Sequence, residues 1–186
     1  MKNPRIISGS AKGIRLEMVP GNITRPITDR VKEALFNIIG ADIFGSTFLD
    51  LFGGTGNVGI EALSRGANKA VFIEISPVAK RIIEKNLEKT KLIDKGNVLR
   101  MDAFKYIQSC HDASFDYVFI APPQYKGIWI KTLGFLDQYP DLSTTDGWLI
   151  VQIDPIEYSQ QELINYSEIE NRKYGSSLLI FFEKKY

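Results

Sequence analysis

The chain has 186 residues, of which 44% are hydrophobic and 24% are charged, and its net charge is only +1. This length and composition exclude a disordered or fibrous protein and fit one domain, residues 1–186, with a complete hydrophobic core. The first ten residues contain no apolar stretch of signal-peptide length, and no apolar run approaches the roughly 20 residues that span a bilayer. We therefore expect a cytoplasmic protein without a membrane partner.

Cysteine and histidine each occur once in the sequence. Cys110 alone excludes an internal disulfide, and His111 stands beside it. One thiol and one imidazole fall far short of a metal-ligand set with recognisable spacing. We expect both residues to be structural or incidental, and we expect no metal.

Basic residues are concentrated near the N-terminus. Residues 1–36 contain seven Lys or Arg and three Asp or Glu, so this part carries a net charge of +4 and the remainder carries −3. A basic arm on a nearly neutral body suits a polyanionic partner, although an ordinary solvated surface would have the same composition. The candidates for contacts with such a partner are Arg5, Lys12, Arg15, Arg25 and Arg30.

The first forty residues predict an arm followed by a helix. Residues 5–8 and 15–19 have the pattern of two short strands around glycines, which indicates a small β-hairpin or an irregular arm. A helix then begins at Thr28 or Asp29, either of which can act as the N-cap, and ends at Gly40.

From residue 47 onward, apolar runs alternate with helical patterns. The predicted strands cover residues 47–51, 70–75, 97–101, 116–120 and 148–153, and the predicted helices cover residues 57–65, 77–90, 104–110 and 126–138. This alternation implies right-handed βαβ units and a mostly parallel sheet with both faces covered. Two final runs, 166–173 and 177–183, predict an antiparallel hairpin at a sheet edge. The polar loop 154–161 carries no chemical signal.

A glycine-rich turn follows the first of these strands. Phe52 is followed by Gly53, Gly54 and Gly56, and a helical segment starts at residue 57. Such a turn exposes backbone amides and a helix N-terminus to a nucleotide-like cofactor. Residues 54–59 (GTGNVG) also match the dinucleotide-binding fingerprint G-x-G-x-x-G, and Glu74 follows about 20 residues later. Nicotinamide or flavin dinucleotides therefore compete with S-adenosylmethionine as the ligand of this loop.

Acids stand at the carboxyl ends of three predicted strands, where open α/β sheets bind ligands: Asp50, Glu74 and Asp102. Each suits one part of S-adenosylmethionine, namely the ammonium, the ribose hydroxyls and the adenine amine, with Phe104 against the adenine ring. An acid at a strand end is also a common helix cap. The residues expected to bind the cofactor are Thr28, Asp50, Phe52, Gly53, Gly54, Gly56, Glu74, Ile75, Asp102 and Ala103.

The fourth strand ends in Ala121, Pro122, Pro123, Gln124 and Tyr125, which are the candidate catalytic residues. A proline pair fixes the backbone so that its carbonyls and the preceding one can accept hydrogen bonds, although it is also found in simple rigid turns. An aromatic side chain nearby can stack on a base. A dinucleotide site leaves this segment unused, whereas methyl transfer to an amine uses all of it.

These motifs resemble the bacterial small-subunit ribosomal RNA guanine-N2 methyltransferases over nearly the whole chain. The resemblance is carried by residues 50–56 (DLFGGTG), 25–33 (RPITDRVKE), 6–9 (IISG) with Lys12 and Gly13, and the proline pair. It implies a Rossmann-like, S-adenosylmethionine-dependent methyltransferase fold, with residues 1–40 as an RNA-facing extension of β-hairpin and helix and 41–186 as the core. It also implies a guanine of 16S ribosomal RNA in a partly assembled small subunit as the substrate, and we expect a monomer.

The sequence departs from this family at the catalytic motif. Family members usually have Asp or Asn where Ala121 stands and an aromatic residue directly after the prolines, whereas here Gln124 displaces Tyr125 by one position. An acceptor that holds the hydrogens of an exocyclic amine eases its attack on the methyl group. The alternatives are therefore an enzyme in which Gln124 or positioning alone replaces the acid, a catalytically weakened RNA-binding or assembly factor, an amino-methylating DNA enzyme, and a dinucleotide-dependent oxidoreductase.

Overall fold

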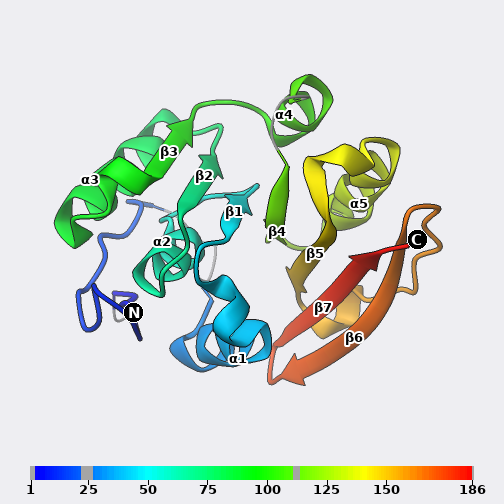
Figure 1. Ribbon diagram of the computed structural model, residues 1–186, viewed down its shortest axis with the longest axis horizontal. Helices are drawn as coiled ribbons and strands as arrows, with labels where there is room; N and C mark the ends of the chain where they lie inside the picture. The colour runs from blue at the N-terminus through cyan, green and yellow to red at the C-terminus, as the bar shows by residue number, and fades with distance from the viewer. Residues whose placement is uncertain (1–2, 22–26, 111–113, 186) are drawn as a thin grey trace.

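The computed structural model of the chain describes residues 3–21, 27–110 and 114–185. The α-helices are α1 (Asp29–Ile39), α2 (Asn57–Ser64), α3 (Pro77–Thr90), α4 (Ala103–Ser109) and α5 (Ile128–Gln138). The strands are β1 (Thr47–Asp50), β2 (Lys69–Ile73), β3 (Gly96–Leu99), β4 (Phe115–Ile120), β5 (Ser143–Ile153), β6 (Tyr166–Tyr174) and β7 (Ser177–Lys184). Short 3-10 turns connect several of these elements (Figure 1).

The strands form one seven-stranded sheet in the order β3-β2-β1-β4-β5-β7-β6 (Figure 1). All neighbouring strands are parallel except β7, which runs antiparallel to both β5 and β6. The predicted parallel sheet with a C-terminal hairpin at its edge is therefore confirmed. The strand order reverses between β1 and β4, so a ligand site is expected where these two strands end.

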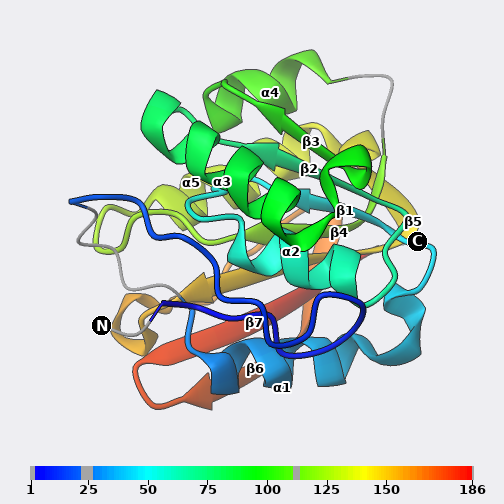
Figure 2. The same cartoon turned by 90° about the vertical axis from the view of Figure 1, so that its left-hand side faces the viewer.

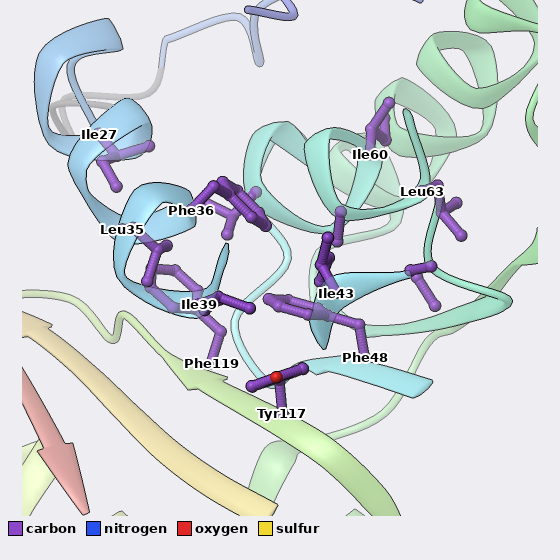
Figure 3. Packing of buried hydrophobic residues seen from close by; sticks show 14 of the residues in the cluster. Ile27, Leu35, Phe36, Ile39, Ile43, Phe48, Ile60, Leu63, Tyr117 and Phe119 are labelled. Atoms are coloured by element: carbon purple, nitrogen blue, oxygen red, sulfur yellow. The ribbon is translucent and has the colours of Figure 1, made fainter. Parts of the chain in front are cut away.

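Two hydrophobic layers cover the sheet. Apolar residues of α1, α2 and α3 pack on one face, and those of α4 and α5 pack on the other. Figure 3 shows the first layer, where Phe36 of α1 lies near Phe48 of β1 with 6.3 Å between ring centroids. Tyr117 and Phe119 of β4 complete this layer from the neighbouring strand. Side chains alternate between the faces along each strand, as expected for a sheet covered on both sides.

Helix α1 forms as its sequence predicts. The hydroxyl of Thr28 accepts a hydrogen bond from the backbone N–H of Val31 at 3.3 Å, which caps the first turn. Leu35 and Ile39 face the core, and the helix stops at Gly40, whose φ of +68° suits glycine. Arg25 of the same sequence motif lies outside the described residues.

Within residues 3–21, the N-terminal arm forms no regular strands, so of the two predicted forms the structure has the irregular arm. Only an isolated antiparallel bridge joins Arg5 to Arg15. The backbone N–H groups of Ile6 and Leu16 donate across the arm to the oxygens of Ile14 and Pro4, at 2.9 and 2.8 Å. The next N–H groups, of Ile7 and Ser8, donate to the Glu61 carboxylate of α2 at 2.8 and 3.0 Å. The arm therefore runs along α2 as an irregular strap (Figure 2).

Lys32 does not belong to the exposed basic surface, although the sequence analysis counted its charge there. Its side chain is fully buried in α1, where the ammonium contacts the Glu61 carboxylate at 3.0 Å. It also donates to the backbone oxygen of Arg5 and to Oδ1 of Asn57, at 2.7 and 2.6 Å. Burial lowers the pKa of Lys32, and Glu61 opposes this shift. Arg65 donates to the other Glu61 oxygen at 2.8 Å, so one buried carboxylate joins the arm, α1 and α2.

Several element boundaries differ from the prediction. Strands β2 and β3 end at Ile73 and Leu99, two residues early in each case, so that their polar termini lie in loops. Helix α5 begins at Ile128 rather than at residue 126, because Gly127 takes a φ of +61° before it. Strand β5 begins at Ser143 instead of residue 148. Within residues 3–21, 27–110 and 114–185, none of the helices combines the length and apolar character of a membrane span.

Candidate functional site

A cavity of about 1090 Å³ opens where β1, β2, β4 and β5 end. Its size is at the upper end of the range for small-molecule sites, which leaves space for more than one ligand group. It is lined by residues from the glycine turn, the strand ends, the N-terminal arm and the β6–β7 turn. All candidate catalytic residues and all candidate cofactor residues except Gly56 contribute to the lining.

The glycine turn is held by backbone hydrogen bonds to its neighbours. The N–H of Gly53 donates to the backbone oxygen of Ile73 at 2.9 Å, and that of Gly54 donates to Oε2 of Glu74 at 2.9 Å. Gly56, which was also expected to bind the cofactor, is not among the residues that line the cavity. It takes a φ of +76° at the start of α2, and a Cβ there would lie 3.0 Å from Ile60 Cδ1. Its contribution is therefore to the turn itself.

Asp50 and Asn57 both line the cavity, and each carries one unpaired polar atom; the two atoms have opposite hydrogen-bonding roles. Oδ1 of Asp50 and Nδ2 of Asn57 are buried and have no hydrogen-bond partner within the described part of the chain. The Asn57 orientation follows from chemistry, because its Oδ1 accepts from the Lys32 ammonium, which can only donate. An acceptor and a donor left open in this way fit the ammonium and carboxylate of an amino acid such as the methionine part of S-adenosylmethionine.

Burial also controls the ionisation of Asp50, which is 2% exposed. Desolvation raises the pKa of its carboxyl group to about 7, with a smaller contribution from the nearby Glu74 carboxylate. Backbone hydrogen bonds from Gly59 and Phe52 act in the opposite direction and offset only part of the shift. The carboxyl group is therefore poised to lose its proton when a cation arrives beside it.

The other two predicted acids also have structural partners. Both Glu74 oxygens accept backbone N–H groups, from Gly54 at 2.9 Å and Ser76 at 2.8 Å. Oδ1 of Asp102 accepts from the first turn of α4 as its N-cap, at 3.0 Å from the backbone nitrogen of Phe104. Each carboxylate oxygen has two lone pairs, so these bonds leave acceptor capacity for a ligand.

Phe104, which was expected against an adenine ring, is not among the residues that line the cavity. Its ring packs on Phe135 of α5 with 5.0 Å between centroids, and the Lys131 ammonium lies 4.4 Å from its centroid. Phe104 lies in the first turn of α4, and its ring packs between α4 and α5. Ile75, Met101 and Ala103 supply the apolar lining at this end of the cavity.

Tyr125 is fixed by two acids that the sequence analysis missed. It is 66% exposed and has a φ of +62°, which is uncommon for a residue other than glycine. Its hydroxyl donates to Oδ2 of Asp154 at 2.8 Å, and its backbone N–H donates to Oε2 of Glu157 at 2.7 Å. Hydrogen bonds from the Ile156 backbone and the Tyr125 hydroxyl lower the pKa of Asp154. The loop after β5 thus orients the aromatic ring at the cavity rim.

The sequence already indicated this loop, since Asp154 directly follows the predicted strand 148–153 just as Asp102 follows the predicted strand 97–101. The sequence analysis assigned no chemical role to this polar loop. Residues 18–21 of the arm, Asn57, Gln152 and the turn residues Ser176 and Ser177 also line the cavity without having been predicted. They come from segments far apart in sequence, which no local pattern connects.

The arm is attached to the site by Asn86 of α3, which is fully buried. Its amide accepts from the Glu17 backbone N–H at 2.7 Å and donates to the Glu17 and Thr55 backbone oxygens at 3.1 and 2.9 Å. One side chain therefore fixes the arm beside the glycine turn, just before the arm enters the cavity wall.

Four of the candidate residues for a polyanion are described, and these lie on the surface and not in the cavity. Lys12, Arg15 and Arg30 are exposed, while Arg5 forms an ion pair with Asp29 at 2.7 Å. Arg25 lies outside the described residues. Among residues 3–21, 27–110 and 114–185, no group of three or more His, Cys, Asp or Glu side chains is arranged to hold a metal ion.

Comparison with known proteins agrees with this architecture. YlbH of Bacillus subtilis, a candidate rRNA methyltransferase, is 39% identical over 153 residues, which covers 81% of this chain and 82% of YlbH. Ribosomal RNA small subunit methyltransferase D of Escherichia coli is 33% identical over 145 residues, covering 78% of this chain and 69% of that protein. The solved structure of yhhF, a candidate methyltransferase of Escherichia coli, has a TM-score of 0.86 at 27% identity and covers 98% of both chains.

These relatives confirm the resemblance inferred from the motifs, and the structural match confirms the Rossmann-like methyltransferase fold. The family model described as Conserved hypothetical protein 95 matches residues 4–183, which is nearly the whole chain. The chain therefore belongs to the Conserved hypothetical protein 95 family.

Proposed function

We propose that this protein is an S-adenosylmethionine-dependent methyltransferase that modifies the exocyclic N2 amine of a guanine in 16S ribosomal RNA. The observation that carries the proposal is that the glycine turn and its acids line the same cavity as the proline pair and Tyr125. A methyl donor on the first group and a base stacked on Tyr125 would therefore meet inside one space. The relatives named ribosomal RNA small subunit methyltransferase D support ribosomal RNA as the substrate class.

In this proposal Asp50 accepts from the cofactor ammonium and Asn57 donates to its carboxylate, because their open atoms match these charges. Glu74 and Asp102 use their remaining lone pairs for the ribose and the adenine amine. The bound cofactor supplies an electrophilic methyl group on a sulfonium. The backbone oxygens of Ala121 and Pro122 face an acceptor base that Tyr125 stacks, and positioning in line contributes much of the acceleration.

The remaining details of the proposal concern the working context. We propose that the protein acts in the cytoplasm as a monomer without metal, on a partly assembled small subunit, with residues 1–40 and 41–186 in one domain. The exposed cations Lys12, Arg15 and Arg30 would contact RNA phosphates, together with Arg5 and Arg25. A second candidate, a catalytically weakened assembly factor, is favoured by Ala121 in place of the usual acid.

The proposed function is tested by transfer of labelled methyl from S-adenosylmethionine. We expect the protein to label small-subunit particles that lack the modification, in preference to naked RNA and to DNA. Labelling of DNA alone would identify an amino-methylating DNA enzyme. If no substrate is labelled while S-adenosylhomocysteine still binds, the protein is the weakened assembly factor. If only a nicotinamide dinucleotide binds, the cofactor assignment is wrong.

Cofactor affinity is expected to depend on the ionisation of Asp50. The pKa of its carboxyl group is about 7, and the ammonium of the ligand requires the ionised form. Below pH 7 a proton must be released before binding, which costs about 1.4 kcal/mol per pH unit. S-adenosylhomocysteine should therefore bind roughly tenfold more weakly at pH 6 than at pH 7.5 in calorimetry, because the carboxyl is mostly protonated at the lower pH.

The control for this pH dependence is 5′-methylthioadenosine, which lacks the amino acid part and should bind equally at both pH values. The variant Asp50→Asn should bind S-adenosylhomocysteine more weakly than the wild type at pH 7.5, and its affinity should not fall further when the pH is lowered to 6. An unchanged pH dependence in this variant would remove Asp50 from the ammonium site.

A further inference from the structure

Gln152 of β5 is the polar side chain nearest in register to the position where the family acid is replaced by Ala121. Phe119 pairs with Ile150 and Ile120 with Val151, so the next step places Ala121 opposite Gln152. Adjacent strands lie about 4.8 Å apart, and alternate residues share a face. Phe119 and Ile150 both belong to the layer under α1 and α2, so Ala121 and Gln152 share that face.

The side chain of Gln152 lies at the wall of the cavity. The residue is only 9% exposed, and no hydrogen bond joins its side chain to any residue that the structure describes. On the other side of Gln152, Leu179 of β7 pairs with it. The side-chain amide of Gln152 can therefore bond to a ligand in the cavity that it lines.

We infer that Gln152 holds the exocyclic amine of the target base and supplies the acceptor that Ala121 lacks. This inference rests on the proposed function. The side-chain oxygen accepts one amine hydrogen, and the side-chain nitrogen can donate to the adjacent ring nitrogen of guanine. An amide held in this way turns the nitrogen lone pair toward the methyl group. The same face carries Ala121, whose small side chain leaves space for the longer glutamine from the next strand.

The chemical step balances without a base at this position. The amine nitrogen forms a bond to the methyl carbon while the carbon–sulfur bond breaks, and the electron pair of that bond remains on sulfur. The sulfonium becomes a neutral thioether, and the methylated nitrogen then releases one proton to water. An amide is not basic enough to take this proton, so Gln152 acts by accepting a hydrogen bond and orienting the amine.

Single-turnover methyl transfer to modification-free small-subunit particles tests the inference. Gln152→Leu, which has similar volume, should lower the rate about 10²-fold while S-adenosylhomocysteine affinity and melting temperature stay unchanged. The matched control is Gln108→Leu, an exposed glutamine of α4 outside the cavity, which should transfer methyl at the wild-type rate. Adding Ala121→Asp to Gln152→Leu should recover at least about tenfold of the lost rate, since a carboxylate then stands on the same face.

A second variant separates a chemical role from a packing role. Gln152→Glu keeps the acceptor oxygen, but burial raises the pKa of a carboxyl group. At saturating S-adenosylmethionine, where the pH dependence of cofactor binding no longer contributes, its rate should increase with pH while the wild type shows no such rise. A pH profile identical to that of the wild type would contradict the inference even if Gln152→Leu does not fold.

The outcomes also distinguish the inference from the proposed function. A wild type that labels no RNA refutes both. A wild type that labels particles at the same rate as Gln152→Leu refutes only the role of Gln152. If Gln124→Ala lowers the rate and Gln152→Leu does not, the exposed glutamine of the motif holds the amine instead.

Discussion

Replacing Glu61 by glutamine is expected to lower the free energy of unfolding by about 3–5 kcal/mol, the usual cost of leaving buried charges without their partner. Its carboxylate accepts from the Lys32 ammonium, the Arg65 guanidinium and two backbone N–H groups of the arm. Glutamine would leave the cations without a counter-charge and direct an NH₂ group at donors. Urea unfolding, with the slope compared between the variants, measures the effect.

The matched control is Glu84→Gln on α3. Glu84 pairs with Lys80 one turn earlier in the helix, but both side chains are partly exposed. Pairs of this kind contribute only about 0.3–0.5 kcal/mol, so this variant should unfold almost as the wild type does. A loss below about 1 kcal/mol in Glu61→Gln would mean that the buried network can relax and that the arm does not depend on it.

Gly9→Ala is expected to detach the arm from α2 and to cost about 3 kcal/mol, from two lost hydrogen bonds and backbone strain. Gly9 has a φ of +83°, and a Cβ there would lie 1.7 Å from the backbone oxygen of Ser64. That oxygen and the Ser64 hydroxyl accept from the N–H groups of Ser10 and Ala11, at 2.8 and 3.0 Å. Amide hydrogen exchange at Ser10 and Ala11 should accelerate accordingly.

Gly13→Ala provides the control for the backbone contribution. Gly13 has nearly the same φ, +87°, but a Cβ there meets nothing within 4 Å. Both variants pay the penalty for a left-handed conformation, about 1–2 kcal/mol, and only Gly9→Ala adds the collision. Equal hydrogen exchange at Ser10 in the two variants would show that the arm can shift along α2 without cost.

The sheet and the cofactor end of the site could be predicted from the sequence because their signals are local. A strand, a glycine turn and a capped helix follow one another within residues 47–64, and the positions of Asp50, Glu74 and Asp102 at strand ends follow from the same reading. Boundaries were less accurate, since strands such as β2 end before their apolar run suggests.

The parts that could not be predicted depend on residues far apart in the chain. Lys32 has the same local pattern as an exposed helix residue, and only its pairing with Glu61, 29 positions later, removes it from the surface. Phe104 follows a strand end as a ligand contact would, but the space between α4 and α5 takes its ring. Gln152 is a single polar residue within an apolar run of β5, and its position opposite Ala121 follows only from the pairing of β4 with β5.

The edge strand β6 also affects how the protein behaves at high concentration. Among the strands of the described sheet it pairs with β7 alone, so its other side presents backbone groups that a strand from another molecule could extend. A bulge between Glu168 and Glu170 interrupts the regular spacing, and exposed Arg172 and Lys173 follow it. Burying these charges against a second strand would require their desolvation. The same edge that completes the fold therefore resists edge-to-edge aggregation.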